Sequence, residues 1–71
     1  MITDQDLQNW FSYHKPEGDQ NEKYETIRTA ALEFAQVILD ETPQSADQTA
    51  AIRKVREAVM TANAAIACGG K

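Results

Sequence analysis

The clearest pattern in the sequence is the spacing of apolar residues along two long segments. In residues 19–42 the apolar positions recur in steps of three and four, which is the spacing of one face of an α-helix. They are Tyr24, Ile27, Ala31, Phe34, Ala35 and Ile38. Residues 45–68 repeat the pattern with Ile52, Val55, Val59, Ala62 and Ile66. The spacing therefore predicts two amphipathic helices of similar length.

Start and stop signals bound these two helices. A capping-box spacing opens each segment, at Asp19–Glu22 and at Ser45–Gln48. Pro43 ends the first segment because a proline disfavours helical geometry in the residue before it. The Gly69–Gly70 pair suits a left-handed cap at the end of the second. Since helices joined by a short connection are usually antiparallel neighbours, a helical hairpin is expected.

A shorter helix is predicted ahead of the hairpin, over residues 4–11. Thr3 or Asp4 is placed to cap it. Its apolar side would hold Leu7, Trp10 and Phe11. The simplest structural role for Trp10 and Phe11 is a hydrophobic plug that closes the open end of the hairpin.

The predicted fold is all-α, an antiparallel two-helix hairpin with a short N-terminal helix. Residues 1–71 form one helical-hairpin domain, in which residues 1–18 are the short helix and a connector. At 71 residues the chain is near the size at which a single core is barely sufficient. Hydrophobic residues make up 42% of it, and much of that share is alanine. We therefore expect the chain to complete its core by assembling into a compact homo-oligomer.

Charge and cysteine content narrow the function classes. The formal net charge is −4, which argues against DNA or RNA polymers as partners, because they need a basic face. No window approaches the roughly 18 consecutive apolar residues of a membrane span, so no membrane partner is expected. Cys68 is the single cysteine and has no intramolecular partner, which favours a reducing, cytosolic compartment.

Catalysis and metal binding are not expected. His14 and Cys68, the only histidine and the only cysteine, stand near opposite ends of the chain. They make a poor nucleophile–base pair and too small a ligand set for a metal site. No glycine-rich phosphate loop is present. The sequence therefore predicts no catalytic residue, no metal ligand and no cofactor.

The connector before the first long helix is the strongest candidate for a binding site. Tyr13 is followed by His14, Lys15 and Pro16, which are poorly suited to a core, and Arg28 lies on the flank of the apolar face. An aromatic ring with cations nearby suits a ligand that has flat rings and phosphates. The structural alternatives are an aromatic plug for Tyr13 and, for Arg28, a salt bridge to Glu25 or another exposed carboxylate.

Two further features of the second helix bear on function. Arg53, Lys54 and Arg56 form a basic run that is best interpreted as a solvated face. In the small-residue stretch MTANAAIA, Asn63 interrupts an otherwise apolar surface. A buried amide needs hydrogen-bond partners, which a second subunit or a ligand edge would supply, and the sequence leaves both open.

Three motifs together resemble a known family. YHKP, DQNEKYETIR and REAVMTANAAIA, taken in this order with a proline-containing turn between the last two, resemble the helical-hairpin domain of phage anti-CBASS cyclic-oligonucleotide sponges. The same hairpin forms part of an anti-Thoeris nucleotide sponge. The likeness covers roughly residues 10–67.

The resemblance implies a phage protein that acts in the host bacterial cytoplasm during infection. It implies that the protein binds and sequesters cyclic di- or trinucleotide second messengers without cleaving them, so that the CBASS effector is not activated. It also implies a homo-oligomer, commonly a hexamer, with pockets at subunit interfaces. By position, Tyr13 would stack on a base and Arg28 would meet a phosphate, with His14 and Lys15 at the rim. Asn63 and Ile66 would line an interface or a second pocket.

One departure from the family bears on the ligand. The family often continues with an arginine after the A-I-A stretch, where this chain has Cys68 and two glycines. The loss of that cation favours cyclic dinucleotides over trinucleotides. An alternative function comes from the acidic residues crowded into the first third of the chain. They suit a small acidic helical protein-interaction module that inhibits a host protein directly.

Overall fold

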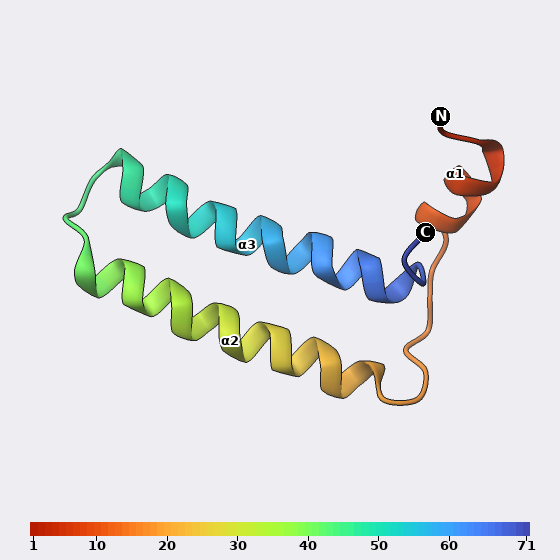
Figure 1. The fold of residues 1–71 in the computed structure, drawn as a ribbon, viewed down its shortest axis with the longest axis horizontal. Coiled ribbons are helices and arrows are strands. Elements are labelled where there is room, and N and C mark those ends of the chain that lie inside the picture. Colours follow the sequence, from red (N-terminus) through yellow and green to blue (C-terminus); the bar gives the residue numbers. More distant parts are fainter.

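Three helices and no strands make up the fold (Figure 1). The computed structural model describes all 71 residues, with α1 at Asp4–Trp10, α2 at Gln20–Glu41 and α3 at Ala46–Ala67. Helices α2 and α3 run antiparallel and are joined by a short turn, and α1 lies beyond their open end, near the C-terminus (Figure 1). The all-α fold and the hairpin predicted from the apolar spacing are confirmed.

Side-chain caps fix the starts of α1 and α3. The Thr3 hydroxyl accepts from the Asp6 N–H at 3.1 Å, and the Asp6 carboxylate accepts from the Thr3 N–H at 2.9 Å, which completes a capping box. At α3 the Ser45 hydroxyl accepts from the Gln48 N–H at 3.1 Å. The Gln48 side chain makes no hydrogen bond back to the Ser45 N–H. Only one of the two hydrogen bonds of the predicted capping box therefore forms there.

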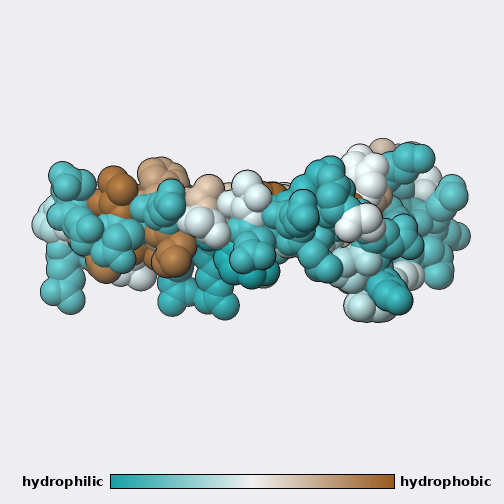
Figure 2. All heavy atoms as spheres, turned by 90° about the horizontal axis from the view of Figure 1, so that it is seen from below, coloured by the Kyte–Doolittle hydropathy of each residue, from teal (hydrophilic) through white to brown (hydrophobic).

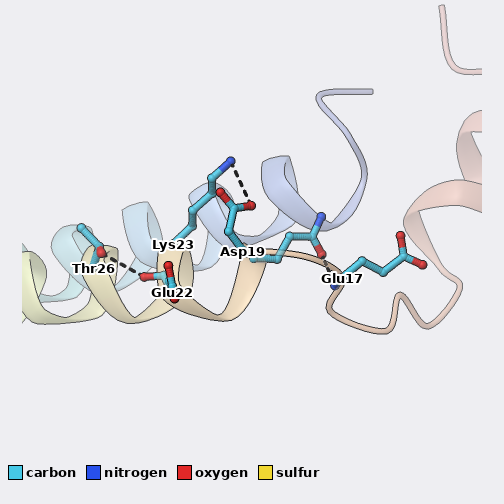
Figure 3. Close-up of polar contacts among 6 residues, drawn as sticks. Glu17, Asp19, Glu22, Lys23 and Thr26 are labelled. Atoms are coloured by element: carbon cyan, nitrogen blue, oxygen red, sulfur yellow. Dashed lines mark hydrogen bonds and ion pairs between the residues drawn. The ribbon is translucent and has the colours of Figure 1, made fainter.

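The capping box predicted at Asp19 and Glu22 is wrong. Asp19 makes no side-chain cap, because its backbone (φ −91°, ψ 11°) is not in the extended conformation seen at Thr3 and Ser45. Its carboxylate lies 3.6 Å from the Lys23 ammonium instead (Figure 3). The first turn of α2 is braced by Gln20, whose side-chain oxygen accepts from the Glu17 N–H at 3.0 Å.

Gln48 closes the turn between the long helices. Its side-chain amide donates to the carbonyl oxygens of Leu39, at 3.2 Å, and Thr42, at 3.1 Å. The last carbonyls of a helix lack intrahelical partners, so these bonds satisfy two groups at the end of α2. Gln48 is the one buried residue of the chain, with 9% of its surface exposed. Its two bonds therefore join the end of α2 to the start of α3.

Replacing Gln48 with alanine should lower the free energy of unfolding by about 1–3 kcal/mol, the cost of leaving buried polar groups unpaired. Gln44→Ala is the matched control, because Gln44 is an exposed glutamine in the same turn. Urea denaturation followed by circular dichroism measures both variants. Equal stability of the two variants would contradict the structural role given to Gln48.

The seam between α2 and α3 is only half-buried. The residues that line it are Tyr24, Ile27, Ala31, Ala35 and Ile38 of α2 and Ile52, Val55, Val59, Ala62 and Ile66 of α3. No apolar residue of the chain is fully buried. Phe34, predicted in this seam, is 58% exposed, because it lies one residue before Ala35 and is turned to one flank. Two helices alone therefore give the chain no closed core.

The chain exposes more surface than a compact protein of its mass. Its accessible area is 5978 Å², whereas a folded monomer of 7.9 kDa is expected to expose about 4,400 Å². The radius of gyration is 15.2 Å, against roughly 11 Å for a compact domain of this length. Figure 2 shows apolar atoms on both sides of the hydrophilic outer edge of the hairpin. Both broad faces of the hairpin therefore present apolar surface.

One broad face contains a shallow groove between α2 and α3, of about 330 Å³. Its lining residues are Phe34, Ile38, Ala51, Lys54, Val55 and Ala58. We call this side of the hairpin the groove face.

The end of α3 has the expected glycine cap. Gly69 and Gly70 have positive φ values of 66° and 77°, and the Gly70 N–H donates to the Ala65 oxygen at 2.8 Å. No helix is both long and apolar enough to span a bilayer.

Candidate functional site

The connector between α1 and α2 presents Tyr13 and Lys15 to solvent. Tyr13 is 86% exposed, and neither residue makes a side-chain hydrogen bond. His14 is half-buried, with its Nε2 2.6 Å from the Asn9 carbonyl oxygen. Because a carbonyl oxygen only accepts, Nε2 carries the proton. His14 thus anchors the connector to α1 and leaves the ring of Tyr13 free.

Helix α1 is held against the end of α3 by polar contacts. The Asn9 amide donates to the Cys68 oxygen at 3.2 Å, and the Trp10 indole N–H donates to the Lys71 oxygen at 3.0 Å. Trp10 lines a shallow pocket with Thr61, Ala64, Ala65, Cys68, Gly70 and Lys71. These contacts fix where the connector starts relative to the hairpin.

The predicted aromatic plug at the open end of the hairpin does not form. Trp10 lies against the C-terminal end of α3, outside the seam between α2 and α3. Phe11 is 83% exposed. The reason is the chain path, since α1 packs beside the last residues of α3 and the connector then leads away to α2 (Figure 1).

Arg28 is an exposed and unpaired cation on α2. The one ion pair of the chain joins Lys23 and Asp19, so the salt bridge to Glu25 considered as an alternative does not form. Arg28 lies eight residues after Gln20, the first residue of α2, or about 12 Å along the helix axis. A single chain therefore gathers Tyr13, His14 and Lys15 in the connector and holds Arg28 about two turns along α2.

Arg28 lies on the broad face opposite the groove. Phe34 directly precedes the seam residue Ala35, whereas Arg28 directly follows the seam residue Ile27. Because each helical residue turns about 100°, side chains before and after a seam residue point to opposite flanks. On α3 the groove residues Ala51, Lys54 and Ala58 likewise precede seam residues.

All three arginines of the chain share this second face. Arg53 follows Ile52 and Arg56 follows Val55, just as Arg28 follows Ile27. None of the three makes an ion pair. Leu32, Leu39 and Met60 each follow a seam residue in the same way and are 69%, 51% and 62% exposed. We call this side of the hairpin the arginine face.

The sequence interpretation missed the relation of Arg53 and Arg56 to Arg28. It assigned the basic run to a solvated surface, and the structure does place these residues in solvent. The available signal was the dipeptide pattern Ile–Arg, Ile–Arg, Val–Arg, in which each arginine follows a seam position. Lys54, in the middle of the run, lines the groove on the opposite face.

Asn63 and Ile66 occupy different parts of α3. Ile66 is half-buried in the seam. Asn63 follows the seam residue Ala62, so it lies on the flank of the arginine face, and its side-chain oxygen is buried without a hydrogen-bond partner. A buried acceptor without a partner is costly, so Asn63 is a point where an added donor would stabilise the structure.

The exposed side chains on these surfaces are of the types that bind ligands. Exposed guanidinium groups beside apolar side chains suit a ligand with phosphates and flat rings. No group of three or more His, Cys, Asp or Glu side chains is placed to hold a metal ion.

Comparison with known families decides the assignment. A family model described as "Acb2/Tad1, hairpin domain" matches residues 3–67. The chain belongs to the Acb2/Tad1 hairpin family. The resemblance in the three sequence motifs is thereby confirmed, and the match covers α1, the connector and both long helices. Comparisons with curated proteins and with solved structures give no match.

Membership in the Acb2/Tad1 family indicates a sponge-type anti-defence role. Members of this family are non-enzymatic sponge proteins. The hairpin seen in the structure is the domain that the family model describes.

Proposed function

We propose that this Acb2/Tad1 hairpin protein binds host cyclic oligonucleotide second messengers and sequesters them without cleavage. Cyclic dinucleotides are the favoured ligands, and their removal keeps the CBASS effector inactive in the cytoplasm of the infected bacterium. The observation that supports the proposal is that two side chains suited to binding a nucleotide are exposed and make no hydrogen bond or ion pair within the chain. Tyr13 is exposed and unbonded, and Arg28 is an unpaired guanidinium on an apolar face, in a chain of a sponge family.

Each side chain has a defined role in the proposed complex. Tyr13 stacks on a base, and Arg28 donates a pair of parallel hydrogen bonds to a phosphate. His14 and Lys15 lie at the rim, where the Lys15 ammonium adds a positive charge. Asn63, on the flank of the arginine face, and Ile66, in the seam, belong to an interface or a second pocket.

The proposed pocket needs two chains. Tyr13 lies in the connector, while Arg28 lies about two turns along α2 of the same chain. Placing the connector of one copy over the arginine face of another brings a ring and a guanidinium to one ligand. The large exposed area of the single chain supports such an assembly, for which we propose a hexamer.

A thermal-shift screen of cyclic di- and trinucleotides tests the proposal. A ligand present at 100 times its dissociation constant stabilises the folded state by about 2.7 kcal/mol. For a chain of this length that corresponds to a rise in Tm of about 10–20 °C. Linear dinucleotides serve as the matched control. A well-folded protein whose Tm no cyclic nucleotide changes would contradict the proposal.

A second candidate function is direct inhibition of a host protein, and one observation favours it. Glu22, Glu25 and Glu33 line a shallow acidic hollow on α2 and make no ion pair. Such a surface could dock on a basic partner. Pull-down from host lysate separates the two functions, because a stoichiometric protein partner with no retained nucleotide would favour this second one.

A further inference from the structure

The two residues that flank Tyr13 in the sequence are both bound to the end of α1. The Ser12 hydroxyl donates to the Gln8 carbonyl oxygen. The His14 Nε2 donates to the Asn9 carbonyl oxygen at 2.6 Å. Both carbonyls belong to the last turn of α1, where carbonyl groups lack intrahelical partners. These two hydrogen bonds hold the backbone on each side of Tyr13, and we call them the Tyr13 clamp.

The end of α1 is itself tied to the end of α3. The Asn9 amide donates to the Cys68 carbonyl oxygen at 3.2 Å, and the Cys68 Sγ lies 3.9 Å from the Asn9 carbonyl oxygen that His14 also contacts. The Trp10 indole N–H donates to the Lys71 oxygen at 3.0 Å. A continuous set of hydrogen bonds therefore runs from the connector, through α1, to the last residues of the hairpin.

The Tyr13 ring is the part of this region that the hydrogen bonds leave free. The connector, residues 11–19, contains no helix or strand, so side-chain hydrogen bonds supply its order near Tyr13. The ring is 86% exposed between its two bound neighbours. A binding group that is already held in its bound position loses less conformational freedom when the ligand arrives, which raises affinity. The clamp therefore has the arrangement needed to present an accessible ring in a fixed place.

We propose that Ser12 and His14 are positioning residues for the nucleotide site, which hold the Tyr13 ring ready for stacking before any ligand arrives. Both act through Tyr13, and neither needs to touch the nucleotide. The inference rests on the proposed function, because it assigns the clamp to the ring that stacks on a base there. It gives Ser12 a role in binding and makes His14 a support for the site in addition to a residue at its rim.

The hydrogen bond of His14 favours positioning over contact with a phosphate. Because Nε2 donates to the Asn9 carbonyl, Nδ1 of the neutral ring is an acceptor. Phosphate oxygens are acceptors as well, so the neutral ring has no donor left for a nucleotide. The neighbouring Lys15 is exposed and makes no ion pair, which leaves its ammonium as the donor at this end of the site.

NMR relaxation of the isotope-labelled full chain tests the clamp without any nucleotide. The order parameter of the Tyr13 amide should be about 0.85 in the wild type and below about 0.6 when Ser12→Ala is combined with His14→Phe. Phenylalanine keeps a ring at this position and removes the donor. His14→Gln keeps an N–H donor, so it should preserve the wild-type order. The matched control is Gln8→Ala, which removes an exposed side chain and leaves the bonded carbonyl in place.

Two measurements on the wild type keep the test decisive if a variant folds poorly. A mobile Tyr13 amide in the ligand-free wild type would overturn the inference. So would nitrogen chemical shifts that place the proton of the neutral His14 ring on Nδ1, because Nε2 could not then donate to Asn9. Among well-folded variants, checked by circular dichroism, a Tyr13 amide as rigid in the double variant as in the wild type would overturn it too.

A double-mutant cycle on binding separates positioning from direct contact. The probes are the cyclic dinucleotides of adenosine and guanosine. His14→Phe should raise the dissociation constant by about 2- to 12-fold, the effect of having to order one more side chain on binding. The same change should have no effect in a Tyr13→Ala background, because a positioning residue acts only through the ring. Equal losses in both backgrounds would show that His14 contacts the nucleotide itself and would overturn the inference.

The two sets of measurements also separate this inference from the proposed function. If the order of Tyr13 falls in the double variant but no cyclic dinucleotide binds the wild type, the clamp is supported and the sponge is contradicted. If the wild type binds a cyclic dinucleotide while the order of Tyr13 is the same in the double variant, the sponge is supported and the clamp is overturned.

Discussion

Replacing Arg28 with alanine should raise the dissociation constant for a cyclic dinucleotide by about 10- to 150-fold. This range corresponds to the 1.5–3 kcal/mol of a hydrogen bond to a charged group. Arg28 makes no ion pair in the chain, so its removal leaves no carboxylate unpaired. Arg28→Lys should recover only part of the affinity, because an ammonium lacks the planar pair of donors. Isothermal titration calorimetry measures all three proteins.

Lys23→Ala is the matched control for Arg28. Lys23 is a cation on the same helix, and it already pairs with Asp19 at the helix start (Figure 3). Its removal changes the net charge of the chain by the same amount. Equal losses for Lys23→Ala and Arg28→Ala would show a general charge effect and contradict a phosphate contact at Arg28.

Replacing Tyr13 with alanine should cost about 1–3 kcal/mol of binding free energy, the usual contribution of a base stacked on an aromatic ring. Tyr13→Phe should bind like the wild type, because the hydroxyl makes no hydrogen bond and stacking needs only the ring. Tyr13 is 86% exposed in the single chain, so neither change should alter helical content. Equilibrium binding and circular dichroism on both variants check these outcomes.

A different result for Tyr13 would have a structural meaning. If Tyr13→Ala dissociates the assembly in the absence of nucleotide, the ring packs against a neighbouring chain. The stacking role would then be wrong. If Tyr13→Phe also loses affinity, the hydroxyl rather than the ring face makes the contact.

The helices follow from the sequence because apolar spacing is a local property. Steps of three and four place the seam residues correctly in α2 and α3 without any knowledge of their partners. Phe34 is the exception in α2, since the spacing rule cannot tell a seam position from its flank. The small residues Ala31 and Ala35 occupy the seam beside it.

Features that depend on a side chain crossing to another segment could not be predicted in this way. Gln48 has the spacing of a capping residue, yet its amide reaches back across the turn to Leu39 and Thr42. Trp10 has the composition of a plug, yet its indole donates to Lys71 at the far end of the chain. Both hydrogen-bonding arrangements depend on how the chain brings separate segments together, which the local sequence pattern does not contain.

Part of the candidate site was predictable because, like the helices, it depends on local sequence. Tyr13 and Lys15 were identified by residue type, because a ring beside a cation suits a ligand with flat rings and phosphates. The common face of the three arginines needed the seam to be known first. Once Ile27, Ile52 and Val55 are placed in the seam, the face of each following arginine is determined.

Retention and recovery of a cyclic dinucleotide tests the sponge most directly. The protein is incubated with the ligand, passed through a filter that holds the assembly, and then heat-denatured to release what it bound. We expect the ligand to be retained by the wild type, lost with the Arg28→Ala variant, and recovered chemically intact by chromatography. Free passage of the ligand through the filter with the wild type, or recovery of linear products, would contradict sequestration without cleavage.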